Sequence, residues 1–216
     1  MGGVIDAFVR AGAQVEVLCL TSGEASTLAE GLGVVTELSE RLPAIRAAEL
    51  QAAATALGVR RTRLLAHPDG GLATLASGVI GADIGSAIQA FAPDGLLVFD
   101  TSGVTGHPDH AVASQAAASV AAQSGLPVLG WALPQPIADA LNERFGAAMA
   151  GVEHRHLAFA LTIDREHQRR AIAAHGSQAV PGSILWHRLE LLGDLEYLRW
   201  INSPPAAVDH HVAANE

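Results

Sequence analysis

Segments with the character of buried strands alternate with helical segments along most of the chain, and this order constrains the fold more than any other feature. The strand-like segments are short, apolar and bounded by turn residues: 14–20, 62–66, 96–99, 127–133 and 157–163. The helical segments between them place apolar residues at helical spacing: 4–10, 39–57 or 43–57, 79–91, 108–124, 137–145 and 166–175. Without an internal repeat or a long linker, this alternation predicts a doubly wound α/β fold, with a mostly parallel sheet and helices on both faces.

One domain is expected to span residues 1–201. The chain has 216 residues, of which 50% are hydrophobic, so a sizeable core can be buried. Residues 183–201 are apolar but mixed in period, so their secondary structure stays open. A loose tail is expected over residues 202–216.

Charge and hydropathy exclude two classes of partner. The formal net charge is −9 and the 13 Lys and Arg residues are scattered, so no basic stripe could neutralise a nucleic-acid backbone. No apolar run approaches the roughly 18–20 residues that a membrane span needs, and no signal segment follows Met1. We therefore expect a cytoplasmic protein that binds neither nucleic acid nor membrane.

The candidate chemistry lies in the loop that follows the strand at 96–99. This loop runs from Asp100 through a Gly-rich stretch to His107-Pro108-Asp109-His110, which places two imidazoles on the opening turn of a helix. Imidazole is a good ligand for zinc and similar ions. A structural explanation is also open, in which His107 caps the helix and His110 pairs with a neighbour. Two histidines alone make an incomplete metal site, because catalytic zinc generally takes three protein ligands.

The block Gly106-His107-Pro108-Asp109-His110 resembles the second signature of the LmbE-like (PIG-L) N-deacetylases. Four more blocks resemble this family in the same order: Leu20-Thr21-Ser22-Gly23-Glu24, Arg46-Ala47-Ala48-Glu49, Pro68-Asp69-Gly70-Gly71 and Ala174-His175-Gly176-Ser177-Gln178. The resemblance covers the chain from Met1 to about Trp200. It implies a Rossmann-like domain in which a divalent metal, usually zinc, activates water to remove an N-acetyl group, commonly from an amino sugar.

The resemblance also implies roles for particular residues. His110 would be a metal ligand, His107 would stabilise the oxyanion of the tetrahedral intermediate, and Asp109 would orient an imidazole. Three residues would line the substrate pocket: Arg46, Asp69 and, as the weaker candidate, Glu24. His175 follows the family pattern but is equally well explained as a residue interacting with a helix end. Thr105 stands where some relatives carry tyrosine, which puts a phenolic role in doubt.

The first signature of the family, His-Pro-Asp-Asp, supplies two metal ligands and the general base, and this sequence does not contain it. In the family a Gly-Gly pair follows that signature within a few residues, and this chain begins Met1-Gly2-Gly3. One interpretation is that Met1 is an internal methionine and that an upstream strand completes the site. The other is a real truncation, which would leave the neighbouring strands with unpaired backbone edges.

Two other functional classes compete with the enzyme. A binding protein or pseudoenzyme would keep Arg46, Asp69 and His107 but hold metal weakly. A nucleotide-dependent α/β enzyme is disfavoured, because no Gly-x-Gly-x-x-Gly or phosphate-loop pattern follows any strand. The expected partner is an N-acetylated small molecule, such as an amino-sugar conjugate, and self-association into a homo-oligomer is left open.

Overall fold

The computed structural model describes residues 1–25 and 35–204, with side chains described for 1–25 and 41–204. The helices are α1 (Gly2–Arg10), α2 (Val35–Ala56), α3 (Val79–Phe91), α4 (Pro108–Gln123), α5 (Gln135–Phe145), α6 (Glu166–Ala174) and α7 (Ile184–Leu192). The strands are β1 (Glu16–Thr21), β2 (Arg61–His67), β3 (Leu96–Phe99), β4 (Val128–Ala132), β5 (Phe159–Thr162) and β6 (Leu195–Asn202). The expected α/β class is confirmed.

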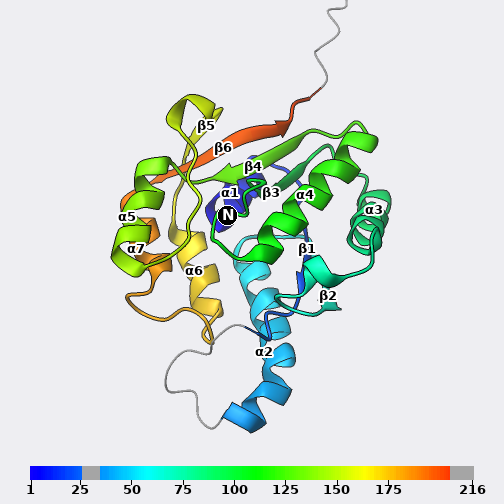
Figure 1. Cartoon of the computed structure of the whole chain (residues 1–216), viewed down its shortest axis with the longest axis horizontal. Helices are drawn as coiled ribbons and strands as arrows, with labels where there is room; N and C mark the ends of the chain where they lie inside the picture. Colours follow the sequence, from blue (N-terminus) through cyan, green and yellow to red (C-terminus); the bar gives the residue numbers. More distant parts are fainter. Residues whose placement is uncertain (26–34, 205–216) are drawn as a thin grey trace, which may run out of the picture.

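The strands form two sheets (Figure 1). β1 and β2 pair in parallel as a two-stranded sheet, and the second sheet has the order β3-β4-β6-β5. Within the second sheet β3 and β4 are parallel, whereas β6 runs antiparallel to both β4 and β5. Half of the strand pairings are thus antiparallel.

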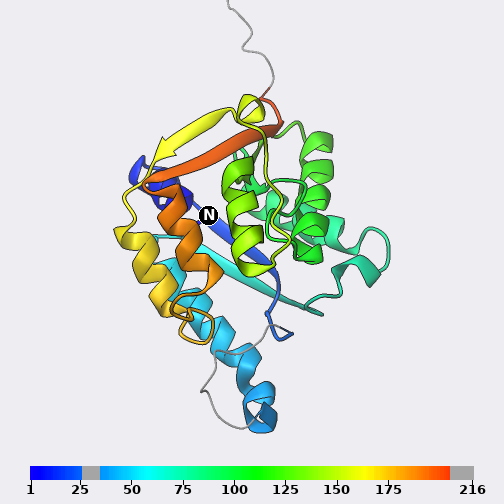
Figure 2. The ribbon, with the colours of Figure 1, turned by 60° about the vertical axis from the view of Figure 1, so that its left-hand side comes forward.

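Helices cover both faces of the strands, as the alternation of side chains in β3 shows. Leu96 and Val98 pack into a cluster formed with α3 and α4, while Leu97 and Phe99 pack into a cluster on the opposite face with residues of α1, α5 and α7. Side chains of successive strand residues point to opposite faces, so an apolar strand of this kind requires cover on both sides. Figure 2 shows α3 and α4 on one side of the strands and α6 and α7 on the other.

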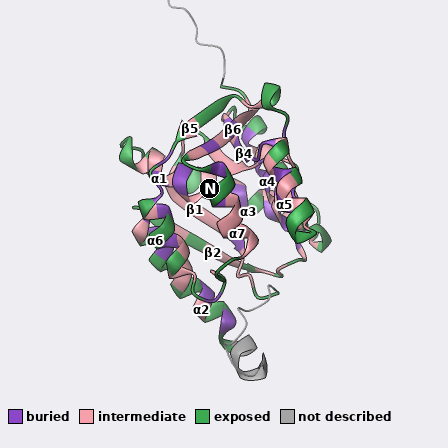
Figure 3. Ribbon diagram, turned by 90° about the vertical axis from the view of Figure 1, so that its left-hand side faces the viewer, coloured by how far each residue is buried: buried purple, intermediate pink, exposed green. Residues whose placement is uncertain are grey.

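A third cluster joins α2 to α6 and fixes the outer layer. Ala53 and Leu57 of α2 pack against Ala171 of α6, and Ile5 of α1 lies against the same group. The outer sides of α2 and α6 carry exposed residues, as expected for amphipathic helices on a surface (Figure 3). This packing holds α2 against the segment that follows α6.

The single, mostly parallel sheet expected from the sequence is not formed. The strands expected at 14–20 and 62–66 pair with each other, and the strand at 96–99 pairs with β4 instead of joining them. One edge of β1 and one edge of β3 have no partner strand among the described residues. The two sheets are linked through side chains, because Leu18 and Leu20 of β1 share the α3–α4 cluster with Leu96 and Val98. The parallel pairings are right and the single sheet is wrong.

The segment at 183–201, left open by its mixed periodicity, contains α7 and β6. Gly193 separates them with a φ of 58°, a left-handed conformation that a residue with a side chain rarely adopts. Asn202, placed in the tail from the sequence, is the last residue of β6 and donates from Nδ2 to the carbonyl of Ala118. The rest of the expected tail, from 205 onward, lies outside the described residues. Within the described chain, no helix is long and apolar enough to cross a membrane.

Candidate active site

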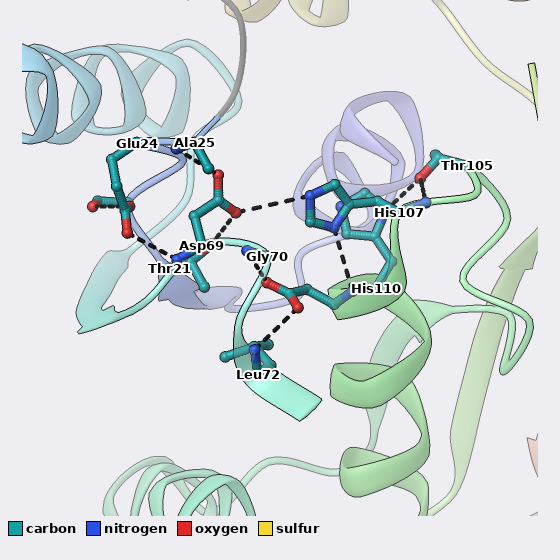
Figure 4. Close-up of polar contacts among 11 residues, drawn as sticks. Thr21, Glu24, Ala25, Asp69, Gly70, Leu72, Thr105, His107 and His110 are labelled. Atoms are coloured by element: carbon teal, nitrogen blue, oxygen red, sulfur yellow. Dashed lines mark hydrogen bonds and ion pairs between the residues drawn. The ribbon is translucent and has the colours of Figure 1, made fainter. Parts of the chain in front are cut away.

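Segments that follow β1, β2 and β3 bring the side chains of the candidate site together (Figure 4). Thr21 ends β1 and the loop after it carries Glu24, the loop after β2 carries Asp69, and the loop after β3 leads into α4 with His107 and His110. Nε2 of His107 lies 3.9 Å from Oδ1 of Asp69. These side chains come together from distant parts of the sequence, at the strand ends where α/β proteins bind ligands.

His107 is the N-cap of α4, and Pro108 occupies the first helical position. Nδ1 of His107 accepts a hydrogen bond from the backbone N–H of Asp109 at 3.3 Å. Because Nδ1 accepts, the neutral ring carries its proton on Nε2, the atom that faces Asp69. The side chain is 40% exposed and accessible to a ligand. His107 therefore caps the helix through Nδ1, and its Nε2 remains available to a ligand.

His110 lies one turn further along α4, with its ring centroid 5.1 Å from that of His107. Its Nδ1 is 2.6 Å from Oγ1 of Thr105, and its ring stacks on Phe99 at a centroid distance of 4.4 Å. Burial lowers the pKa of His110 below the ordinary value of 6.5, and the neighbouring His107 adds to this effect. The imidazole is therefore neutral near pH 7, which is the form that binds a metal.

Thr105 is a site residue whose contact with His110 was not predicted from the sequence. Its hydroxyl meets Nδ1 of His110 and thereby fixes the orientation of the ring. A metal-ligating histidine commonly has its second ring nitrogen held in this way. Only its position five residues before His110, across Gly106-His107-Pro108-Asp109, could have indicated the contact.

Asp109 has partners other than the imidazole expected from the sequence. Its carboxylate is buried, with the residue only 4% exposed, and accepts hydrogen bonds from the backbone N–H groups of Gly70 at 2.7 Å and Leu72 at 3.1 Å. Its hydrogen bonds thus tie the loop after β2 to the first turn of α4, because a buried carboxylate requires donors and these two amides supply them. The described hydrogen bonds of the Asp109 carboxylate hold the loop after β2, and its role in orienting an imidazole stays a prediction.

The Gly-rich loop between β3 and α4 is held in a tight conformation. Gly103 has a φ of 79°, and a Cβ built on it would lie 2.7 Å from the backbone nitrogen of Ala111. Val104 is fully buried with a φ of 59°, an uncommon conformation for a β-branched residue. Asp100, at the start of the loop, accepts from the N–H of Ser102 and forms an ion pair with Arg199 at 2.9 Å. These contacts fix the conformation of the loop and therefore the position of His107 at the start of α4.

Asp69 is held by the loop after β1. Its carboxylate accepts from the hydroxyl of Thr21 at 3.3 Å and from the N–H of Ala25 at 3.1 Å, and its own N–H donates to Oε1 of Glu24 at 2.8 Å. Burial acts to raise the pKa of Glu24, but the hydrogen bonds from Asp69 and Ser22 hold it below its ordinary value. Glu24 itself is exposed, so it joins two loops at the rim of the site.

Arg46 reaches the same region from α2. It is 5% exposed, and its NH1 lies 3.9 Å from Oε2 of Glu49. Burial lowers its pKa, while the charges of Glu49 and Asp69 act in the opposite direction. Arg46 is thus a buried cation within electrostatic range of Asp69, and its assignment to the substrate pocket stays a prediction.

The metal expected from the sequence has an incomplete set of ligands here. The imidazole of His110 is held at Nδ1 by Thr105, and a neutral imidazole is a suitable metal ligand. Among the side chains described, those of residues 1–25 and 41–204, however, no group of three or more His, Cys, Asp or Glu residues could hold a metal ion. The described residues therefore supply one suitable metal ligand, His110, and do not supply the complete set that a metal site needs.

Two known deacetylases are similar to this chain, one in sequence and one in structure. The deacetylase of 1D-myo-inositol 2-acetamido-2-deoxy-α-D-glucopyranoside from Nakamurella multipartita is 27% identical over 257 aligned residues, which cover 96% of this chain and 86% of that protein. The structure of the N,N'-diacetylchitobiose deacetylase from Pyrococcus horikoshii superposes with a TM-score of 0.64 at 23% identity, covering 94% of this chain and 78% of that one.

A similar fold also occurs in a protein of different activity. The 4-carboxy-2-hydroxymuconate hydratase from Pseudomonas putida has a TM-score of 0.65 at 16% identity, covering 96% of this chain and 92% of that one. The fold alone thus does not decide the reaction. The family description GlcNAc-PI de-N-acetylase (PIG-L) matches residues 1–121, more than half of the 216 residues. This chain belongs to the PIG-L family.

Proposed function

We propose that this protein removes the N-acetyl group from an amino-sugar conjugate. The observation that carries the proposal is the convergence of His107, His110 and Asp69 at the ends of β3 and β2 in a chain of the PIG-L family. A relative of 27% identity is named for deacetylating an N-acetylglucosaminyl inositol, which makes conjugates of that chemistry the first substrates to try.

His107 is the residue suited to the reacting carbonyl group. Its Nε2 carries the proton, is exposed to ligand and is fixed by the capping bond at Nδ1. Such a donor stabilises the negative charge that develops on the carbonyl oxygen when the amide is attacked. Asp69, 3.9 Å away, orients this imidazole and faces the polar groups of a sugar, with Arg46 behind it.

Zinc or another divalent cation is the proposed cofactor, with His110 as its one described ligand. The neutral imidazole and the Nδ1 contact with Thr105 support this role. Asp109 acts indirectly, since its carboxylate holds the loop that carries Asp69. The incomplete set of described ligands favours a second candidate, a protein of the same fold that binds the amino sugar without hydrolysing it.

Acetate release tests the proposal. The substrates are N-acetylglucosaminyl inositol and N,N'-diacetylchitobiose, supplied with zinc to the 216-residue chain and to the same chain preceded by a strand that carries His-Pro-Asp-Asp. We expect acetate from the longer form and little from the shorter one. Tight sugar binding without acetate from either form would favour the binding protein, and neither binding nor acetate would refute the proposed substrate class.

A further inference from the structure

A second polar cluster lies behind Arg46, where α2 meets the turn that follows α6. Glu49 of α2 accepts two hydrogen bonds from Ser177, one from the backbone N–H at 2.7 Å and one from the hydroxyl at 2.6 Å. Nδ1 of His175 lies 3.9 Å from the same carboxylate. The Glu49 side chain is only 11% exposed and Ser177 is buried. Both oxygens of Glu49 are therefore fixed by a segment 128 residues away in the sequence.

Alternating negative and positive side chains, Glu49, Arg46 and Asp69, connect this cluster electrostatically to the active site. Oε2 of Glu49, the oxygen that accepts from the Ser177 hydroxyl, lies 3.9 Å from NH1 of Arg46. Arg46 in turn is influenced by the charge of Asp69, and Asp69 lies 3.9 Å from His107. A buried guanidinium needs a carboxylate to offset its loss of hydration, and here the charges of two carboxylates, Glu49 and Asp69, favour its charged form.

We propose that Glu49, anchored by Ser177, is a positioning residue that aims Arg46 at the substrate side of Asp69. This inference rests on the proposed function, in which Arg46 and Asp69 bind the amino sugar. Glu49 touches neither His107 nor His110 in any described contact, so its effect on the ligand passes through Arg46. The turn at 175–178 thereby acquires a role in ligand affinity, although it lies outside the strand-end loops.

The expected effect follows from the contacts that each change removes. Glu49→Gln keeps the shape of the side chain but loses the charge that faces Arg46 and one of the two acceptors for Ser177, and we expect the Kd for N-acetylglucosaminyl inositol to rise about tenfold. Ser177→Ala removes only the hydroxyl bond and leaves the backbone N–H, so a rise of about threefold is expected. Glu143→Gln, on the exposed side of α5, is the matched control and should leave the Kd unchanged.

A double-mutant cycle separates positioning from a purely structural role. Calorimetry gives the Kd of the 216-residue chain, Glu49→Gln, Arg46→Ala and the double variant. If Glu49 acts through Arg46, Glu49→Gln changes the Kd less than twofold in the Arg46→Ala background. Equal effects of Glu49→Gln in both backgrounds, or a lower melting temperature with an unchanged Kd, would overturn the proposal.

A measurement without substrate keeps this inference separate from the proposed function. The side-chain Nε–H signal of Arg46 in NMR spectra should be shifted and slowly exchanging in the unmodified chain, and should move toward free-arginine values in Glu49→Gln and part of the way in Ser177→Ala. This result supports the positioning even if the unmodified chain does not bind the sugar, a failure that would count against the substrate class alone. An Arg46 signal identical in all three proteins would refute the positioning by Glu49.

Discussion

Asp109→Asn tests the contact that holds the active-site loops together. The carboxylate of Asp109 is buried and accepts the N–H groups of Gly70 and Leu72, one at each oxygen. In the asparagine variant one oxygen remains for one amide, while the new NH₂ group faces the other N–H. One charge-assisted hydrogen bond is lost and one buried donor is left unsatisfied.

The magnitude follows from these two losses. A hydrogen bond to a charged group contributes about 1.5–3 kcal/mol, so Asp109→Asn should lower the free energy of unfolding by about 2–3 kcal/mol. Asp109→Ala leaves both amides without an acceptor and should cost about 4 kcal/mol. The exposed Asp139 of α5 provides the control, because Asp139→Asn should change the free energy of unfolding by no more than about 0.5 kcal/mol.

Urea unfolding at pH 7 measures the free energies, with the slope of the transition as a check that the unfolded state is unchanged. Hydrogen exchange at Gly70 and Leu72 should become faster in both Asp109 variants, because these are the amides that lose their acceptor. An Asp109→Asn protein as stable as the unmodified chain, with the same exchange at both amides, would show that this carboxylate does not hold the loop.

Three other predictions concern protonation, the buried core and the metal. Burial lowers the pKa of His110 in the folded state, so the unfolded chain takes up this proton first as the pH falls. His110 therefore makes the protein less stable below about pH 6.5. His110→Gln should flatten that part of the curve of unfolding free energy against pH. Glu196, which is 1% exposed and bonded to Trp131 and Arg165, should cost about 3–5 kcal/mol when changed to alanine, because Arg165 is left as an unpaired buried charge; a loss below 1 kcal/mol in urea unfolding would contradict this. The 216-residue chain should bind zinc weakly, since catalytic zinc takes three protein ligands, and stoichiometric zinc surviving dialysis would show that ligands other than His110 have been overlooked.

The parts of the fold that depend on local sequence could be predicted. The strand Leu96–Phe99 and the helix Val79–Phe91 have the expected bounds, because turn residues mark their ends and their side chains follow a clear period. The pairing of strands could not be predicted in the same way. Pairing depends on contacts between distant segments, and the sequence of β1 does not reveal that it would pair with β2 alone.

The same distinction applies to the candidate site. The motif at 106–110 and its place after an apolar strand located His107 and His110, and the neighbouring strand ends brought Asp69 to them. The partners of Asp109 were missed because Gly70 and Leu72 lie in another loop and contribute only backbone amides, which a sequence motif does not display.

We propose that His110 holds the metal whereas His107 acts on the substrate, and a comparison of three proteins separates these two roles. Zinc content and acetate release from N-acetylglucosaminyl inositol are measured together for the chain preceded by the His-Pro-Asp-Asp strand and for its His110→Ala and His107→Ala variants. We expect His110→Ala to lose both zinc and activity, and His107→Ala to keep its zinc while its turnover falls about 100-fold or more, the usual cost of removing an oxyanion donor. Full zinc and normal turnover in His110→Ala, or loss of zinc in His107→Ala, would contradict this division of roles.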